Sequence, residues 1–230
     1  FIGNAIIDVI CLRNELYKND IKIISLSRHT KPDKHNVTYL QADVNRKIDI
    51  PYKVDYVLHL ASNTHPAQYA SDPVGTILTN VIGCKNLLDV ACENSSRFLL
   101  ASSVEIYGQC GETPADESYC GYIDCNTARA GYNEAKRTCE SLVQSYRAQY
   151  GVKASIVRLA RCFGTDVTKK DTKAMAQFMA AALNGEDIVL KSEGKQRYSY
   201  CFYADAVSGI FKVLLDGEDG EAYNVSDDDD

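Results

Sequence analysis

The sequence reads DYVLHLAS at residues 55–62, DPVGTILTNVIGCKNLLDVACEN at 72–94 and RFLLASS at 97–103. The first and third stretches are short and apolar, as expected for strands that are buried on both faces of a sheet. The middle stretch has apolar residues at helical spacing and opens with Asp-Pro, a common start of a helix. Together they predict two parallel strands joined by a helix, the repeating unit of parallel α/β folds.

The same alternation continues in both directions along the chain. The other predicted elements are strands over 21–27, 37–43 and 153–160 and helices over 3–18, 129–150, 172–184 and 204–216. Gly151 follows the helix over 129–150, at a position where helices commonly end. We therefore predict an α/β fold with a Rossmann-like, doubly wound parallel sheet and helices on both faces. Residues 1–165 would form the dinucleotide-binding domain, and 166–230 a partial substrate-binding region interleaved with the last elements of the sheet.

Composition excludes several classes of partner. The net charge of -6 over 230 residues argues against a general affinity for nucleic acid. No apolar run approaches the roughly 18 residues that span a membrane. The nine cysteines show no C-x-x-C spacing, which favours reduced thiols in a cytoplasmic protein and no metal site.

Functional residues should lie just after each strand, because ligands of such sheets bind at the carboxyl ends of the strands. Gly3 opens the first helix, where a glycine allows close approach of a pyrophosphate. Ser27 and Arg28 follow the next strand and could accept a 2′-phosphate, while Asp43 could reach an adenine edge. Small residues at 61 and 62 leave room for a cofactor.

A tyrosine and a lysine, Tyr132 and Lys136, lie four residues apart in the stretch AGYNEAKR. On a helix this spacing places both side chains on one face. The spacing alone is common, so its meaning depends on the stretch ASSVEIYG that comes before it, with Ser102, Ser103 and Glu105 at a strand end. A positive charge beside a phenol stabilises the phenolate, and a neighbouring hydroxyl can share its proton.

Seven stretches, in this order, resemble the extended short-chain dehydrogenase/reductase family of NAD-dependent nucleotide-sugar epimerases and dehydratases: FIG, ADV, DYVLHLAS, TNVIGCKNLLDVA, ASSVEIYG, GYNEAK and VRLARCFG. They cover nearly the whole chain. The resemblance implies NAD as cofactor, with NADP also possible, a nucleotide-sugar substrate and a homodimer. The family pattern continues upstream of FIG and beyond YNVS, so this sequence is expected to lack the first strand and most of the C-terminal substrate lobe.

The resemblance also implies roles for individual residues. The expected catalytic residues are Ser103, Glu105, Tyr132 and Lys136. The expected cofactor-binding residues are Ile2, Gly3, Arg28, Asp43, Val44, Leu60, Ala61, Ser62, Ser102, Tyr132, Lys136 and Leu159. The expected substrate-binding residues are Ser103, Arg129, Arg161, Arg197 and Tyr198.

Within the family, residues 117–142 are similar to UDP-glucuronate decarboxylases, including Arg129 three residues before the tyrosine. Val104 occupies the place of the aspartate of dehydratases, which counts against dehydration. Two positions depart from the decarboxylase pattern: Arg161 stands where asparagine is usual, and Tyr198 stands where an arginine grips the substrate. The reaction expected is transient oxidation at C4 of the sugar followed by decarboxylation or epimerisation.

Alternatives remain open from the sequence. An NADP-dependent ketosugar reductase is motivated by Ser27 and Arg28, and a non-catalytic dinucleotide-binding module would need no Tyr132–Lys136 pair. Arg129 and Arg161 are equally well explained as structural ion-pair partners. His59, within an apolar strand, is expected to be a core histidine whose nitrogens are hydrogen-bonded, and Asn80 is expected to bond nearby backbone.

Overall fold

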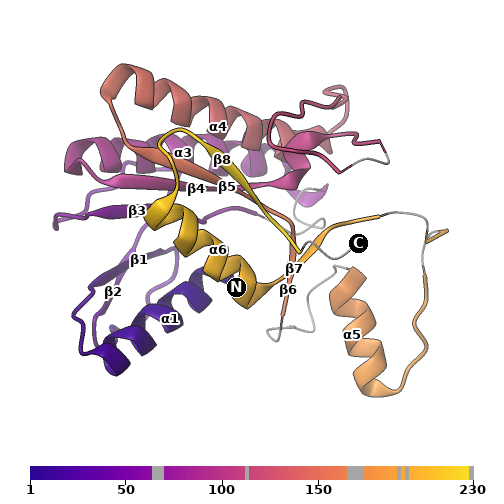
Figure 1. The fold of residues 1–230 in the computed structure, drawn as a ribbon, viewed down its shortest axis with the longest axis horizontal. Coiled ribbons are helices and arrows are strands. Elements are labelled where there is room, and N and C mark those ends of the chain that lie inside the picture. Colours follow the sequence, from indigo (N-terminus) through magenta and orange to yellow (C-terminus); the bar gives the residue numbers. More distant parts are fainter. Residues whose placement is uncertain (64–69, 112–113, 165–173, 191–192, 195–196, 228–230) are drawn as a thin grey trace.

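A computed structural model describes residues 1–63, 70–111, 114–164, 174–190, 193–194 and 197–227 (Figure 1). The helices are α1 Ile2–Tyr17, α3 Pro73–Asn94, α4 Ala130–Tyr150, α5 Ala174–Asn184 and α6 Tyr203–Asp216, with one 3-10 turn, η1 Val104–Tyr107. The strands are β1 Ile23–Ser27, β2 Val37–Gln41, β3 Tyr56–His59, β4 Arg97–Ser103, β5 Ala154–Leu159, β6 Arg161–Phe163, β7 Tyr200–Phe202 and β8 Ala222–Val225.

The central sheet has the order β3–β4–β5–β8, and all of its pairs are parallel. Strand β4 pairs with β5 so that Ser103 lies opposite Leu159 at the carboxyl edge. Strands β1 and β2 form a separate parallel pair, as do β6 and β7. Within the described residues, no backbone ladder joins β1 to β3.

Helices cover both faces of the sheet, α3 and α4 on one and α1 and α6 on the other (Figure 1). Alternate residues of β4 divide between the two cores: Phe98 and Leu100 pack toward α3 and α4, and Leu99 and Ala101 toward α1 and α6. This alternation follows from the two-residue period of a strand, and it explains why the whole run is apolar. The predicted doubly wound α/β fold is confirmed.

Local sequence signals set most helix ends where they were predicted. Asp72 caps α3, its Oδ1 accepting a hydrogen bond from the Gly75 amide at 2.9 Å, and Pro73 occupies the first helical turn. Gly151 ends α4 with a φ of 68°, a conformation that glycine adopts without steric cost. The predicted start of the helix over 172–184 lies outside the described residues at 172 and 173.

The strands are shorter than predicted at several ends. Strand β1 begins at Ile23, β2 ends at Gln41, and β3 ends at His59. The predicted functional residues Asp43, Leu60 and Ser62 therefore lie in loops beyond the strands. Leu60 is apolar because it packs against the core on the α1 and α6 face, although it does not pair in the sheet, whereas Ala61 is exposed.

In the part of the chain that the structure describes, no helix is both long and apolar enough to cross a membrane. No group of three or more potential metal-ligating side chains is found among the same residues.

His59, the last residue of β3, is fully buried, as the sequence predicts, but the prediction that its nitrogens are hydrogen-bonded is wrong. Neither ring nitrogen makes a hydrogen bond to a described residue, and the backbone of Asn80 lies near the ring without adopting hydrogen-bonding geometry. Burial, and secondarily the positive charge of Lys136, lower the pKa of His59 to about 3. Sequence patterns do not predict this, because the partners of a core histidine come from distant segments.

This depressed pKa predicts a loss of stability in mild acid. Between pH 6.5 and 3 the unfolded state binds a proton at His59 that the folded state does not, so the free energy of unfolding falls as the pH falls. The contribution of one such group between pH 7 and pH 5 is about 2 kcal/mol. Urea unfolding at both pH values should show a smaller acid destabilisation in His59→Leu than in the native chain. Equal pH dependence of the two proteins would contradict this account.

Candidate active site

The N-terminus of α1 and the loop after β3 lie side by side. A Cβ added at Gly3 would meet Leu60 Cδ1 at 3.8 Å, an ordinary contact distance. No side chain caps α1 and its first turn has no acidic residue, so its amide donors are open to an anion. Ile2, Leu60 and Leu159 are partly buried and pack together with the core on the α1 and α6 face.

The loop after β2 also reaches this region, by way of α3. The Val44 side chain packs against Gly83, where a Cβ would come within 3.0 Å of it, and the Asn86 amide donates to the Val44 carbonyl at 2.8 Å. Asp43 Oδ1 accepts a hydrogen bond from the Asn45 amide at 3.0 Å. Glycine at 83 therefore permits the close approach of this loop to the helix.

Arg28, after β1, has an exposed side chain. Its carbonyl accepts a hydrogen bond from Gln41, but its guanidinium makes no hydrogen bond or ion pair with any described residue. A free cation therefore stands at the end of β1, where the sequence predicted contact with a cofactor.

Asn80 of α3 links the β3 loop to α4, the helix that carries Tyr132 and Lys136. The Ser62 hydroxyl donates to Asn80 Oδ1 at 2.9 Å, and the Cys139 thiol lies 3.3 Å from the Asn80 carbonyl oxygen. The Asn80 amide donates to the Thr76 carbonyl at 2.8 Å, which confirms the prediction that it bonds nearby backbone. Ser62 is thus bonded to the residue of α3 that also contacts α4.

Tyr132 and Lys136 lie on the buried face of α4, with 6% and 3% of their surfaces exposed. The Lys136 ammonium is 5.9 Å from the centroid of the Tyr132 ring. It donates a hydrogen bond at 2.8 Å to the carbonyl of Ala101, two residues before Ser103 on β4. Lys136 therefore connects α4 to the strand that carries Ser103.

The start of α4 is also bonded to η1, which follows directly on Ser103. The Asn133 amide donates to the Glu105 carbonyl at 2.9 Å, and Arg137 Nε donates to the Ile106 carbonyl at 2.8 Å. The Ser103 hydroxyl oxygen accepts from the Glu105 amide at 3.3 Å. All four predicted catalytic residues therefore belong to one bonded assembly of β4, η1 and α4.

Two arginines hold the carboxylate of Glu105. Arg129 reaches Oε2 at 3.0 Å, and Arg161 reaches Oε1 at 3.5 Å. The guanidinium of Arg161 lies over the Tyr198 ring, 3.4 Å from its centroid. The structure therefore brings together Arg129, Arg161 and Tyr198, whereas Arg197 is exposed and bonds to no described residue.

A buried network that the sequence did not predict lies behind the site. Glu140 accepts hydrogen bonds from the Ser102 hydroxyl at 2.5 Å and from Arg158 at 2.8 and 3.2 Å. Arg158 also donates to the Tyr107 hydroxyl at 3.0 Å and to the Glu117 carbonyl at 2.7 Å. Burial opposes the charge of Arg158, but the bonds to Glu140 outweigh it and raise the pKa of the guanidinium.

This network limits the predicted role of Ser102 in cofactor binding, and one residue of the sequence could have indicated it. The Ser102 hydroxyl is directed into the protein, so any contribution of Ser102 to cofactor binding rests on its backbone. The signal is Arg158, a charged residue inside the apolar strand ASIVRLA, because a buried cation requires a partner.

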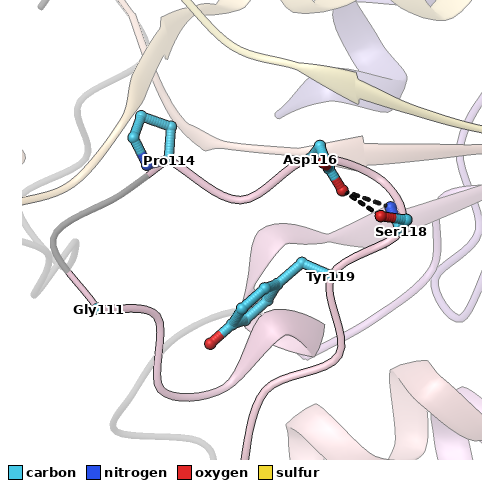
Figure 2. A pocket seen from close by; sticks show the side chains of 5 residues that line it. All are labelled: Gly111, Pro114, Asp116, Ser118 and Tyr119. Carbon is cyan, nitrogen blue, oxygen red and sulfur yellow. Dashed lines mark hydrogen bonds between the residues drawn. The ribbon is translucent and has the colours of Figure 1, made fainter.

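A cavity of about 370 Å³ lies in the segment between η1 and α4, lined by Gly111, Pro114, Asp116, Ser118 and Tyr119 (Figure 2). Asp116 Oδ1 accepts hydrogen bonds from the amide and the hydroxyl of Ser118, at 2.9 and 2.6 Å, which lower the pKa of the carboxyl group. No predicted site residue lines this cavity, so it is separate from the assembly around Tyr132.

The fold and the bonded assembly define a Rossmann-like α/β protein with a tyrosine–lysine pair beside a strand-end serine. Comparison with known proteins supports this class. Residues 1–226 match the NAD dependent epimerase/dehydratase family. UDP-glucuronic acid decarboxylase 5 of Arabidopsis thaliana is 32% identical over 234 residues, which cover 98% of this chain and 66% of that protein.

Solved structures share the fold. UDP-glucose 4-epimerase of Thermotoga maritima, solved with UDP-glucose, has a TM-score of 0.83 at 21% identity over 98% of this chain and 74% of that chain. UDP-glucose 4-epimerase of Thermus thermophilus, in complex with NAD, has a TM-score of 0.81 at 21% identity over 100% and 75%. The chain belongs to the NAD dependent epimerase/dehydratase family. It spans about two thirds of the length of the Arabidopsis relative.

The network around Arg158 predicts a stability effect. Arg158→Met leaves the Glu140 carboxylate buried without its partner, and removing one member of a buried pair costs about 3 kcal/mol or more. Urea unfolding followed by circular dichroism measures this loss. The matched control is Lys212→Met, which removes an exposed ion pair to Asp216 and should leave the unfolding midpoint unchanged. Equal effects of the two substitutions would contradict a structural role for Arg158.

Proposed function

We propose that this chain carries the catalytic site of an NAD-dependent nucleotide-sugar-modifying enzyme, which transiently oxidises C4 of the sugar and decarboxylates a C6 carboxylate. The observation that carries the proposal is the buried pair Tyr132 and Lys136, fixed to β4 just before Ser103. The similarity to a UDP-glucuronic acid decarboxylase supports the choice of reaction. A binding module alone has no use for a buried lysine beside a phenol.

The residues present fit a dinucleotide cofactor. The uncapped N-terminus of α1 beside Leu60 suits a pyrophosphate, and Lys136 suits a ribose next to the nicotinamide. The exposed guanidinium of Arg28 and the Asp43 loop are available to the adenosine end. When bound, the nicotinamide supplies a hydride acceptor and donor.

The chain's own residues handle the protons. Tyr132 takes the proton of the C4 hydroxyl, because the Lys136 ammonium stabilises the negative charge that develops on the phenol oxygen. Ser103 hydrogen-bonds the same substrate oxygen. The resulting C4 ketone makes a C6 carboxylate a β-keto acid, which loses carbon dioxide. Glu105 stands two residues from Ser103 and could instead accept a C5 proton, which would lead to epimerisation.

A second candidate is an NADP-dependent ketosugar reductase. The guanidinium of Arg28 favours it, because this group is exposed, is paired with no described residue and can bind a 2′-phosphate. The two candidates differ in whether the cofactor is consumed. Absorbance at 340 nm that stays constant while product forms supports the decarboxylase, and a steady fall in a reaction started with NADPH supports the reductase.

The proposal also covers the setting of the enzyme. We propose a cytoplasmic location, which is supported by the nine cysteines, all of them free thiols. A homodimer is supported by the outer face of α3, where Val74, Ile77 and Leu78 are exposed.

The central test is Tyr132→Phe in the full-length protein incubated with NAD and UDP-glucuronate. Removing the proton acceptor should lower turnover by about 10²- to 10⁴-fold. Mass spectrometry of the sugar nucleotide identifies the reaction, since loss of carbon dioxide, loss of water and no change of mass are distinct outcomes.

The matched control is Tyr150→Phe, at the exposed end of the same helix, which should keep native turnover. Full turnover of Tyr132→Phe would overturn the assignment of the tyrosine. Native protein that converts no sugar nucleotide in a panel carrying UDP, dTDP, GDP and CDP would overturn the proposed function.

A further inference from the structure

Counted over the described residues, the side chains around Glu105 carry more positive than negative charge. Two guanidiniums, those of Arg129 and Arg161, meet a single carboxylate. The side chains are partly open to solvent, 52% for Arg129, 41% for Arg161 and 28% for Glu105. Exposed ion pairs of this kind contribute little to stability, so the surplus charge is not explained by a need of the fold.

Arg161 is the less constrained of the two arginines. The one hydrogen bond from its guanidinium to a described residue runs from a single terminal nitrogen to Glu105 at 3.5 Å, the outer limit for such a bond. The other N–H groups of the guanidinium bond to no described residue. The Tyr198 ring, 3.4 Å away, fixes the plane of the guanidinium while leaving those donors open.

Arg161 and Tyr198, the two residues that depart from the decarboxylase pattern, therefore form one local arrangement. Arg161 on β6 and Tyr198 just before β7 lie in stacking contact, and β6 pairs with β7 from Arg161 onward. A guanidinium at 161 that is oriented by an aromatic ring at 198 supplies a planar, two-pronged donor for a carboxylate or a phosphate.

The position of the Glu105 cluster relative to Ser103 determines which anionic group of the substrate lies nearest to it. Glu105 is two residues from Ser103, whose hydroxyl oxygen accepts the Glu105 amide at 3.3 Å, so the cluster lies next to the catalytic hydroxyl. In a pyranose bound with C4 at that hydroxyl, C6 is two bonds from C4, whereas C1 with its diphosphate lies across the ring. The anion nearest the cluster is the carboxylate on C6.

We propose that Arg161, oriented by Tyr198, is the residue that selects a C6 carboxylate on the sugar, and that Glu105 holds the arginine ready until the substrate carboxylate engages its free donors. The proposal rests on the proposed function, because it assumes a nucleotide sugar at Tyr132. Arg161 is the specificity-determining residue and Tyr198 is a positioning residue.

The test is calorimetric titration of full-length protein with NAD and three probes: UDP-glucuronate, UDP-glucose and UDP. A Tyr132→Phe background prevents turnover. Arg161→Met in that background should weaken UDP-glucuronate by about 10- to 100-fold, as expected for loss of a charged hydrogen-bonded pair, and UDP-glucose and UDP by less than about 3-fold. Arg13→Met removes another arginine stacked on a tyrosine, Tyr17 at 5.2 Å, and is the matched control with no expected change.

Variants at 198 test the positioning role. Tyr198→Phe keeps the ring and should retain native affinity, whereas Tyr198→Leu should weaken UDP-glucuronate selectively. Equal weakening of all three probes by Arg161→Met would assign the arginine to the diphosphate and overturn the proposal, as would unchanged binding of all three. Binding of no probe by the Tyr132→Phe parent would overturn the proposed function as well.

Discussion

The hydrogen bond from the Lys136 ammonium to the Ala101 carbonyl is the interaction on which the site depends. A cation that is 3% exposed must find a partner in the protein, and this one finds it on the backbone of β4. The bond sets the distance between α4 and the central strand, and therefore between Tyr132 and Ser103. The same charge helps to keep His59 neutral at the end of the neighbouring strand. The Lys136 ammonium thus affects both the arrangement of the candidate site and the charge state of a buried histidine in the core.

Short-range patterns in the sequence were sufficient for the elements that carry this bond. The apolar run 97–103 and the helical period over 129–150 placed a strand-end serine before a tyrosine–lysine pair, and the structure has β4 and α4 within one residue of those ranges. The doubly wound fold followed from the same alternation. These patterns could not predict which residues, far apart in the sequence, become hydrogen-bond partners. Arg158 bonds Glu140, which is 18 residues away in the sequence. The ring nitrogens of His59 are hydrogen-bonded to none of the described residues, and that depends on how several distant segments pack around the ring.

Arg129 and Arg161 also show that the sequence alone does not predict contacts between distant residues. From the sequence, Arg129 and Arg161 could equally be structural ion-pair partners, and each does pair with Glu105. Only three-dimensional packing reveals that both meet the same carboxylate and that Arg161 rests on Tyr198. A pair of unusual residues 37 positions apart thereby becomes a single local arrangement. Departures from a family pattern are most informative when the structure shows whether they touch.

The contact between the loop after β2 and α3 has a consequence for ligand affinity. Val44 packs against Gly83, and the Asn86 amide donates to the Val44 carbonyl, so α3 holds this loop in place relative to the central sheet. A dinucleotide that reached from Arg28 to Lys136 would contact both the β1–β2 pair and the central sheet. Its affinity would therefore depend on how closely α3 fixes the positions of the two ladders.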